Sequence, residues 1–217
     1  MTRVVLATRN HHKVVELRHI LADVCEELGL EIVGASDFPD APDVVEDGVT
    51  FEENARLKAV AVAQATGLPS IADDSGLAVD VLGGAPGIFS ARWAGSHGND
   101  RANLELLLDQ LSDVKDEHRG AAFVCAAVLA LPDGTTRSAE GRMPGSVARE
   151  PKGTNGFGYD PILVVEGDGR HCAELSKEEK NAISHRGKAF RAMVPNLREL
   201  LGGARQQPAA GDPAATS

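Results

Sequence analysis

Short apolar runs and helix-spaced apolar residues alternate along the first part of the chain. A β-branched run over residues 4–7 stops at polar residues and predicts a buried strand, and a second strand is expected over 31–34. Between the two runs, apolar residues recur at the spacing of one helix face, at Val14, Leu17, Leu21 and Val24. This spacing predicts a helix of about 12 residues that begins near His11 or His12.

A capping signal then predicts a second helix. Thr50 is placed to cap its N-terminus, and Glu53, three residues later, is placed to bond back to the cap as in a capping box. An alanine-rich stretch continues the helix, and Gly67 ends it. The strand expected next, over 68–72, leaves the sequence Asp73-Asp74-Ser75-Gly76 at its carboxyl end.

The rest of the chain is predicted to hold a hairpin and further helices. A Pro132-Asp133-Gly134 turn has the chemistry that joins two hairpin strands. In chain order, the expected elements are more strand over 77–82, a helix over 99–111, hairpin strands over 121–131 and 135–143, a glycine-rich loop over 153–161, a strand over 162–165, and a helix over 177–201 that is interrupted at Gly187 and Pro195.

Alternating strands and helices around a central hairpin predict an α/β fold. We expect a mixed central sheet flanked by helices, with two lobes and an active-site cleft between them. A single domain is expected over residues 1–201. Residues 202–217 consist largely of Gly, Ala, Pro and Gln without an apolar pattern, which predicts a disordered tail.

Composition and charge narrow the range of functions. Of the 217 residues, 42% are hydrophobic and 25% are charged, which excludes a chain that is disordered throughout. With 22 basic and 32 acidic residues, the net charge is −10, so binding along a nucleic-acid backbone is disfavoured. A small polyanion can still bind where a few cations or a divalent metal offset its charge.

Cysteine usage and hydropathy indicate the compartment. Cys25, Cys125 and Cys172 are far apart and form neither a disulfide framework nor a zinc-site spacing, so we expect a reducing environment. The N-terminus lacks the apolar run of a signal peptide, and the longest apolar run, over 121–131, is too short to span a bilayer. We therefore expect a cytoplasmic protein that has no membrane partner.

The first of four polar clusters lies between the first strand and the first helix. Its residues are Thr8, Arg9, Asn10, His11, His12 and Lys13. A helix N-terminus presents free backbone N–H groups and favours an anion, so this segment with its two cations can hold a phosphate. It is not a Walker A loop, because the required glycines are absent. A polar helix start capped by Asn10 is the alternative explanation.

The second and third clusters are acidic. Asp73 and Asp74 should face opposite sides of their strand, and adjacent carboxylates need a cation or hydrogen bonds to hold them. Glu46 lies in an irregular loop and could join Asp74 in binding Mg²⁺, which usually takes one or two protein carboxylates together with substrate phosphates. The alternatives are an Asx turn at the aspartates and a solvated loop acid at Glu46. Glu53 is explained by its capping role.

The fourth cluster combines the loop over 153–161 with basic residues downstream. Glycines beside Phe157 let a ligand approach the backbone next to an aromatic ring, and a base stacked on such a ring gains about 1–3 kcal/mol. Aromatic residues make up only 4% of the chain, yet this loop holds both Phe157 and Tyr159. Acceptors and donors for a ligand follow at Asp160, Lys180, His185 and Arg186. An ordinary basic helix face is the alternative for Lys180 and Arg186.

The four clusters together supply a phosphate site, a metal site, a stacking ring and donors for a base edge, which indicates a nucleotide pyrophosphohydrolase. The chain resembles the inosine triphosphate and dITP/XTP pyrophosphatases, which clear non-standard purine nucleotides. The matching stretches follow the family's order and spacing up to residue 201 and are VVLATRNHHKVVEL, DGVTFEENARLKA, IADDSGLAVDVLGGAPGIFSARWAG, GTNGFGYDPIL and ELSKEEKNAISHRGKAF.

The resemblance implies a role for each matching residue. Asp74 is similar to the family's general base and metal ligand, and Glu46 to an acid that binds magnesium in some members. Residues 8–13 resemble the triphosphate-binding loop, and Lys58 a lysine near the phosphates. The residues that resemble other substrate contacts are Ser75, Phe157, Gly158, Tyr159, Asp160, Lys180, His185 and Arg186.

The resemblance also implies an activity and an assembly. We expect Mg²⁺-dependent hydrolysis of a purine nucleoside triphosphate (ITP, dITP or XTP) to the monophosphate and pyrophosphate, and a homodimer. Two alternatives remain open at this stage: a pyrophosphatase for modified pyrimidine or ordinary nucleotides, and a non-catalytic nucleotide sensor. A nucleic-acid-binding protein is disfavoured by the charge.

Overall fold

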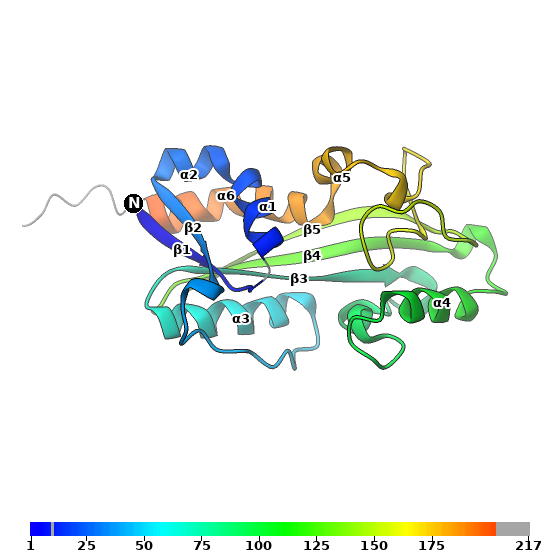
Figure 1. Ribbon diagram of the computed structural model, residues 1–217, viewed down its shortest axis with the longest axis horizontal. Helices are drawn as coiled ribbons and strands as arrows, with labels where there is room; N and C mark the ends of the chain where they lie inside the picture. The colour runs from blue at the N-terminus through cyan, green and yellow to red at the C-terminus, as the bar shows by residue number, and fades with distance from the viewer. Residues whose placement is uncertain (10, 203–217) are drawn as a thin grey trace, which may run out of the picture.

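The computed structural model describes residues 1–9 and 11–202, which fold around one six-stranded sheet (Figure 1). The strands are β1 (Thr2–Leu6), β2 (Leu30–Gly34), β3 (Ser70–Val79), β4 (Gly120–Ala130), β5 (Thr136–Val147) and β6 (Leu163–Val165). Their order in the sheet is β2-β1-β3-β4-β5-β6. β1 is parallel to β2 and β3, whereas the pairs from β3 to β6 are antiparallel, so the sheet is mixed as predicted.

Helices cover both faces of this sheet. They are α1 (His11–Ile20), α2 (Ala22–Leu28), α3 (Phe51–Thr66), α4 (Asp100–Gln110), α5 (Lys177–Ile183) and α6 (His185–Leu201). Figure 1 shows α1, α2 and α6 on one face of the sheet and α3 on the other. The arrangement confirms the predicted α/β fold. Among the described residues, no helix combines the length and apolar character needed to cross a bilayer.

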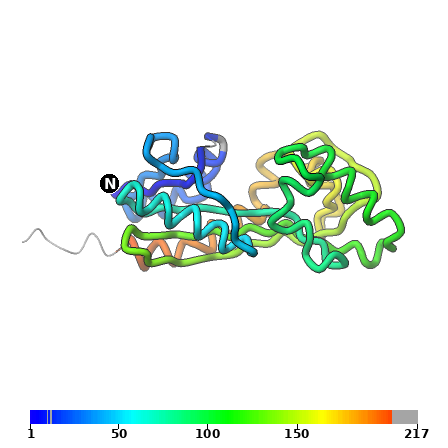
Figure 2. Tube along the Cα trace, turned by 90° about the horizontal axis from the view of Figure 1, so that it is seen from below, coloured from blue at the N-terminus to red at the C-terminus, as the bar shows by residue number. Residues whose placement is uncertain are grey.

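The long strands β3, β4 and β5 extend through two lobes, which Figure 2 shows side by side. In one lobe, α1, α2 and α6 pack on the sheet around a core that contains Ile71 of β3. In the other lobe, a separate core contains Leu77 of the same strand, together with Leu107 of α4. Because β3 passes from one core to the other, the polar residues between Ile71 and Leu77 lie where the lobes meet.

The path of β3 corrects the prediction that Asp73 and Asp74 follow the end of a strand. The strand continues to Val79, and each of its residues pairs with β4, with Asp74 opposite Ala126. The long neighbouring strand supplies ladder partners through the polar residues, so local polarity does not end the strand. Gly76 is therefore not a turn residue: a Cβ there would lie 2.4 Å from Ser90 Oγ.

The C-terminal helix also differs from the prediction. The helical conformation is interrupted at Ser184, between α5 and α6. The second helix, α6, then continues through both Gly187 and Pro195. The Ser184 hydroxyl caps α6 by accepting a hydrogen bond from the Gly187 N–H at 3.0 Å. Pro195 is exposed, so water can solvate the carbonyl that lacks its helical donor. The first predicted helix is likewise two helices, α1 and α2, which separate at Leu21.

The predicted ends of α3 are confirmed with one change. Thr50 Oγ1 accepts a hydrogen bond from the Glu53 N–H at 3.1 Å, and Gly67 ends the helix with a φ of 67°. The Glu53 carboxylate accepts from the N–H of Val49 at 2.7 Å, one residue before the cap, rather than from Thr50. Of the predicted tail over 202–217, the residues from 203 onward lie outside the described part of the chain.

Candidate active site

The two adjacent aspartates of β3 face opposite sides of the sheet, as strand geometry predicts. Asp73 Oδ2 accepts a hydrogen bond from Arg186 Nε of α6 at 3.1 Å and lies 3.5 Å from Lys13 Nζ of α1. Asp74 Oδ2 accepts a hydrogen bond from the side-chain amide of Asn54 of α3 at 3.1 Å. The pair thus connects β3 to helices on both faces.

Asp73 is a buried anion that is stabilised by cations. Burial on its own would raise the pKa of this carboxyl, but the charges of Lys13 and Arg186 bring the pKa well below its usual range. Arg186 Nη1 also lies 3.4 Å from Glu16 Oε2 of α1. Because Lys13 and Glu16 belong to α1 and Arg186 to α6, this ionic network fixes the two helices at the centre of the site.

Asp74 has the opposite electrostatic character. Burial raises the pKa of its carboxyl, and the nearby carboxylate of Glu46 raises it further. Lys58 and the hydrogen bond from Asn54 act in the other direction but do not reverse the shift. A second hydrogen bond, from the N–H of Ser75 to Asp74 Oδ1 at 3.0 Å, fixes the orientation of the carboxylate.

Lys58 of α3 joins the two predicted magnesium ligands. Its Nζ lies 3.0 Å from Glu46 Oε2 and 3.7 Å from Asp74 Oδ1. The side chains of Lys58 and Asp74 are each 17% exposed, and that of Glu46 is 37% exposed. The geometry brings Glu46 and Asp74 together around one positive charge, although 28 residues separate them in the sequence.

This donor set fits Mg²⁺ only as a partial shell. Within the described residues, no group of three or more His, Cys, Asp or Glu side chains is placed to hold a metal ion alone. Mg²⁺ commonly uses one or two carboxylates and completes its shell with water and substrate phosphates. Glu46 and Asp74 supply the two carboxylates, which already lie on either side of the Lys58 ammonium. A phosphorylated ligand would have to supply the further oxygens.

The predicted phosphate loop borders the same carboxylates. A cavity of about 190 Å³, which we call the phosphate-loop cavity, is lined by Thr8, Arg9, Glu46 and Lys58 among others. Arg9 Nε donates to Asp43 Oδ1 at 3.2 Å, and its Nη2 donates to a backbone carbonyl in the same loop at 3.0 Å. The guanidinium therefore reaches the loop that carries Glu46.

The other residues of the predicted phosphate loop have different positions. Lys13 belongs to the Asp73 network, and His11 is the exposed first residue of α1. Asn10 and the side chain of His12 lie outside the described residues.

A second cavity, of about 120 Å³, is lined by most of the predicted base-binding residues, and we call it the base cavity. Those that line it are Ser75, Phe157, Gly158, Tyr159, Asp160, Lys180 and His185. They come from β3, the 153–161 loop, α5 and α6, so the fold brings together segments that are far apart in the sequence. Arg186 lines neither of these two cavities, because its guanidinium points into the Asp73 network.

Phe157 and Lys180 form the outer part of this base cavity. The ring of Phe157 is 68% exposed, and Lys180 Nζ lies 5.3 Å from its centroid. Buried Asp160 holds both residues, since its Oδ2 accepts the Phe157 N–H at 2.9 Å and forms an ion pair with Lys180. An exposed ring on an anchored backbone is suited to stack on a planar ligand.

Tyr159 supplies a wall to the base cavity but not a free hydroxyl. Its side chain is buried, and its O–H donates to the backbone carbonyl of Ser90 at 2.9 Å. Burial and the nearby Asp100 carboxylate raise the pKa of the phenol above its usual value. The hydroxyl is therefore neutral and already hydrogen-bonded within the protein.

His185 is a neutral imidazole at the inner end of the cavity. Its ring stacks on Phe123 with the centroids 5.1 Å apart, and burial together with the charges of Arg186 and Lys180 lowers its pKa to about 3. Nδ1 is buried and has no hydrogen-bond partner among the described residues. A neutral imidazole has one donor and one acceptor, so it can contact a base edge without adding charge.

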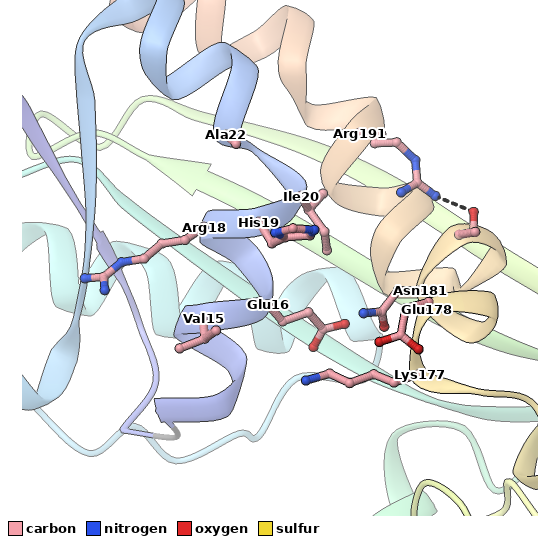
Figure 3. A pocket seen from close by; sticks show the side chains of 11 residues that line it. Val15, Glu16, Arg18, His19, Ile20, Ala22, Lys177, Glu178, Asn181 and Arg191 are labelled. Carbon is pink, nitrogen blue, oxygen red and sulfur yellow. Dashed lines mark hydrogen bonds between the residues drawn. The ribbon is translucent and has the colours of Figure 1, made fainter.

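A larger cavity, of about 750 Å³, lies between α1 and the α5–α6 segment (Figure 3). Figure 3 shows Glu16, Lys177, Glu178 and Asn181 at its centre. None of the predicted site residues lines it, and its connection to the site is through Glu16, which contacts Arg186. Most of its side chains belong to solvated helix faces, so size alone does not identify the site.

Several further residues line the base cavity and were not predicted from the sequence. They are Gly76, Ser90, Ala91, Asp100, Asn103 and Phe123. Asp100 and Asn103 sit in the first turn of α4, where an acidic or amide residue has an ordinary role in starting a helix. Ser90 belongs to the matched IFSARW stretch, but the sequence does not show that it lies beside β3. In the structure, Ser90 lies close to Gly76, and its hydroxyl accepts a hydrogen bond from the Leu77 N–H.

Comparison with known proteins decides the family. The model of the Ham1 family matches residues 4–196. The chain belongs to the Ham1 family. Proteins named dITP/XTP pyrophosphatase are similar to it: that of Streptomyces avermitilis is 68% identical over 202 residues, covering 93% of this chain and 100% of the relative. The corresponding Leifsonia xyli protein is 54% identical over 200 residues, covering 92% of this chain and 98% of the relative.

Solved Ham1 structures share the fold. The Staphylococcus aureus Ham1 protein aligns with a TM-score of 0.82 and 41% identity, over 91% of this chain and 99% of that one. A Mycobacterium abscessus structure described as a nucleoside-triphosphatase and dITP/XTP pyrophosphatase aligns with a TM-score of 0.76 and 52% identity, over 89% of this chain and 100% of that one. The resemblance noted from the sequence is confirmed at the level of family and fold.

Proposed function

We propose that this Ham1 protein is a nucleoside triphosphate pyrophosphohydrolase that converts the non-standard purine nucleotides dITP, XTP and ITP to the monophosphate and pyrophosphate. The observation that carries the proposal is the position of Asp74. Its carboxylate lies with Glu46 and Lys58 beside the phosphate-loop cavity, and the next residue, Ser75, lines the base cavity. The names of the relatives support the same activity.

The chain's own charges are arranged for a bound triphosphate. The cations Arg9 and Lys58 line the phosphate-loop cavity, and Lys13 extends from the start of α1, whose N-terminus favours an anion. Holding the triphosphate at several points places the scissile bond in line for attack. Ionised Asp73 keeps Lys13 and Arg186 in fixed positions rather than reacting itself.

Asp74 is the proposed general base. Its two hydrogen bonds fix the carboxylate, and its raised pKa increases its affinity for a proton compared with an exposed aspartate. It would orient the attacking water and accept its proton. When bound by Glu46 and Asp74, Mg²⁺ would offset the negative charge that develops on the phosphate oxygens.

The residues of the base cavity favour binding of purines that have a 6-oxo group. Phe157 provides a stacking surface, while Lys180 and the neutral His185 provide donors at the cavity. Adenine has a 6-amino group, which would leave such a donor unpaired, and an unpaired buried donor costs about 1–3 kcal/mol. Two such mismatches would reject ATP strongly.

A substrate panel tests the proposal. The purified protein is incubated with Mg²⁺ and, separately, ITP, dITP, XTP, the four ordinary nucleoside triphosphates and methylated pyrimidine triphosphates. We expect pyrophosphate and a monophosphate from the first three, and no product when EDTA replaces Mg²⁺. Preferential cleavage of a pyrimidine would favour the alternative specificity, and binding without cleavage would favour a nucleotide sensor.

Two further properties belong to this proposal. The family resemblance predicts a homodimer and a cytoplasmic location. Sedimentation equilibrium of the full chain tests the first, with a mass near twice 22.8 kDa as the expected result. Fractionation of the source cells tests the second.

A further inference from the structure

The first turn of α4 forms hydrogen bonds on two sides of the base cavity. On one wall, the N–H of Gly158 in the 153–161 loop donates to Asp100 Oδ2 at 2.8 Å. Just beyond the other wall, where Ser90 and Ala91 of the 3₁₀ segment Gly87–Arg92 line the cavity, the N–H of Ala94 donates to Asn103 Oδ1 at 2.7 Å. One helical turn therefore anchors two segments that are more than 60 residues apart in the sequence.

A third hydrogen bond joins the two walls directly. Tyr159 of the loop donates to the carbonyl of Ser90 in the 3₁₀ segment at 2.9 Å. Asn103, Ser90 and Tyr159 are all buried, and both Asp100 and Asn103 line the cavity itself. The three bonds link α4, the 3₁₀ segment and the 153–161 loop in a closed ring, so the separation of the loop from the 3₁₀ segment depends on all of them.

Hydrogen bonds already anchor the loop just before Gly158: Asn155 donates to the backbone carbonyls of Ala173 and Leu175, and the Phe157 N–H donates to Asp160. Residues 153–157 are exposed, and a further cavity of about 640 Å³ lies on the side of the loop away from the base cavity. Asp100, Phe157 and Gly158 line both cavities, so this part of the loop is a thin wall between two spaces. At Gly158 itself, the hydrogen bond to Asp100 ties the loop to the first turn of α4.

We propose that Asp100 is a positioning residue for base recognition. It holds the backbone at Gly158, and with it the ring of Phe157, at the distance from the Ser90 wall that a purine base needs. The inference rests on the proposed function, because it assigns the ligand of this cavity as the base of the nucleotide. Asp100 acts through the loop and has no part in binding the phosphates.

The test separates the base from the phosphates. Asp100→Ala removes the acceptor, Asp100→Asn keeps an acceptor oxygen, and Asp109→Ala removes an exposed acid from the same helix. For Asp100→Ala we expect the KM for ITP to rise about five- to tenfold with kcat little changed, because the acceptor of one hydrogen bond that positions the loop is lost. Inhibition by inorganic triphosphate, which has no base, should match the wild type. Asp100→Asn and Asp109→Ala should both behave like the wild type.

Several results would overturn the inference. Equal KM values for Asp100→Ala and Asp109→Ala would show that the bond does not position the loop. A parallel loss of triphosphate inhibition would show a general structural defect, and an Asp100→Asn variant as impaired as Asp100→Ala would show that charge matters rather than the acceptor. If Asp100→Ala fails to fold in a thermal melt, Tyr159→Phe, which removes the third bond of the ring, must give the same KM-specific effect.

Failure of the proposed function gives a different pattern. If wild-type protein releases no pyrophosphate from ITP or XTP, the catalytic assignment fails for every variant alike. The positioning role is then read from ITP binding by calorimetry, where Asp100→Ala must still bind more weakly than Asp100→Asn.

Discussion

Asp73 and Asp74 are consecutive residues of β3, yet their carboxylates have opposite electrostatic environments. The pKa of Asp73 is lowered despite burial because Lys13 and Arg186 contact it, whereas the pKa of Asp74 is raised by burial and by Glu46. The first aspartate is therefore stabilised as an anion by the folded state. The second is held as an anion at a cost to stability, as expected of a reactive group.

Replacement of Asp73 is expected to destabilise the fold. Asp73→Asn leaves Arg186, whose side chain is only 12% exposed, with Glu16 at 3.4 Å as its remaining counter-charge, and breaking a buried pair by removing one partner costs about 3–5 kcal/mol. The free energy of unfolding from denaturant titration at pH 7.5 measures this loss. As a control, Glu27→Gln removes the partner of Arg198 at the surface and should leave the unfolding midpoint almost unchanged. Equal effects of the two variants would contradict the assigned role of Asp73.

The stability of the protein should depend on pH through His185. The pKa of this buried imidazole is about 3, below its value of 6.5 in an unfolded chain, so the unfolded state binds more protons between these values. Stability contributed by the neutral ring is present above pH 6.5 and is lost as the pH falls towards 3. His185→Gln should reduce the acid-side slope of unfolding free energy by up to about 1.4 kcal/mol per pH unit. An unchanged slope would show that His185 is not held neutral.

Lys58 is expected to weaken metal binding when no nucleotide is present. Its ammonium already occupies the region between Glu46 and Asp74, so a divalent cation must compete with it. Lys58→Met should bind Mn²⁺, a spectroscopic substitute for Mg²⁺, at least about tenfold more tightly than the wild type in electron paramagnetic resonance titrations. Lys115→Met, a change at an exposed lysine, is the control. Equal Mn²⁺ affinities in all three proteins would separate Lys58 from the metal site.

Phe157 should contribute to ligand binding but not to folding. Its ring is largely exposed, so Phe157→Ala should leave the thermal midpoint unchanged. Loss of base stacking, about 1–3 kcal/mol, should raise the KM for ITP at least about fivefold. Phe89→Ala truncates another half-exposed ring, which packs with Arg92 outside the base cavity, and should not change KM. Similar KM values for the two variants would contradict stacking on Phe157.

The sequence predicted most of the elements because their signals are local. Apolar runs identified β1 and β2, and Thr50 and Gly67 marked the ends of α3. The errors arose where a distant partner decided the structure. β3 continues through Asp73 and Asp74 because β4 pairs with it along its full length, and neither strand's local composition indicates that register.

In the candidate site, too, local features could be predicted from the sequence and contacts between distant residues could not. Each polar cluster could be found from its own residues, and the alternation of a strand correctly placed Asp73 and Asp74 on opposite faces. The bond between Asp73 and Arg186 joins residues 113 positions apart, so no local pattern could assign Arg186 to that network rather than to the base cavity. Asp100 was missed for a similar reason, because its contact is with Gly158, 58 positions away.

The catalytic role of Asp74 is tested most directly by Asp74→Asn. This change keeps the size of the side chain and, because the pKa of the acid is raised in the fold, should not lower the free energy of unfolding at neutral pH. The measurement is pyrophosphate release from ITP with saturating Mg²⁺, together with ITP binding by calorimetry. If Asp74 is the general base, the rate falls at least about a hundredfold while binding is largely retained. A variant that releases pyrophosphate at nearly the wild-type rate would contradict it.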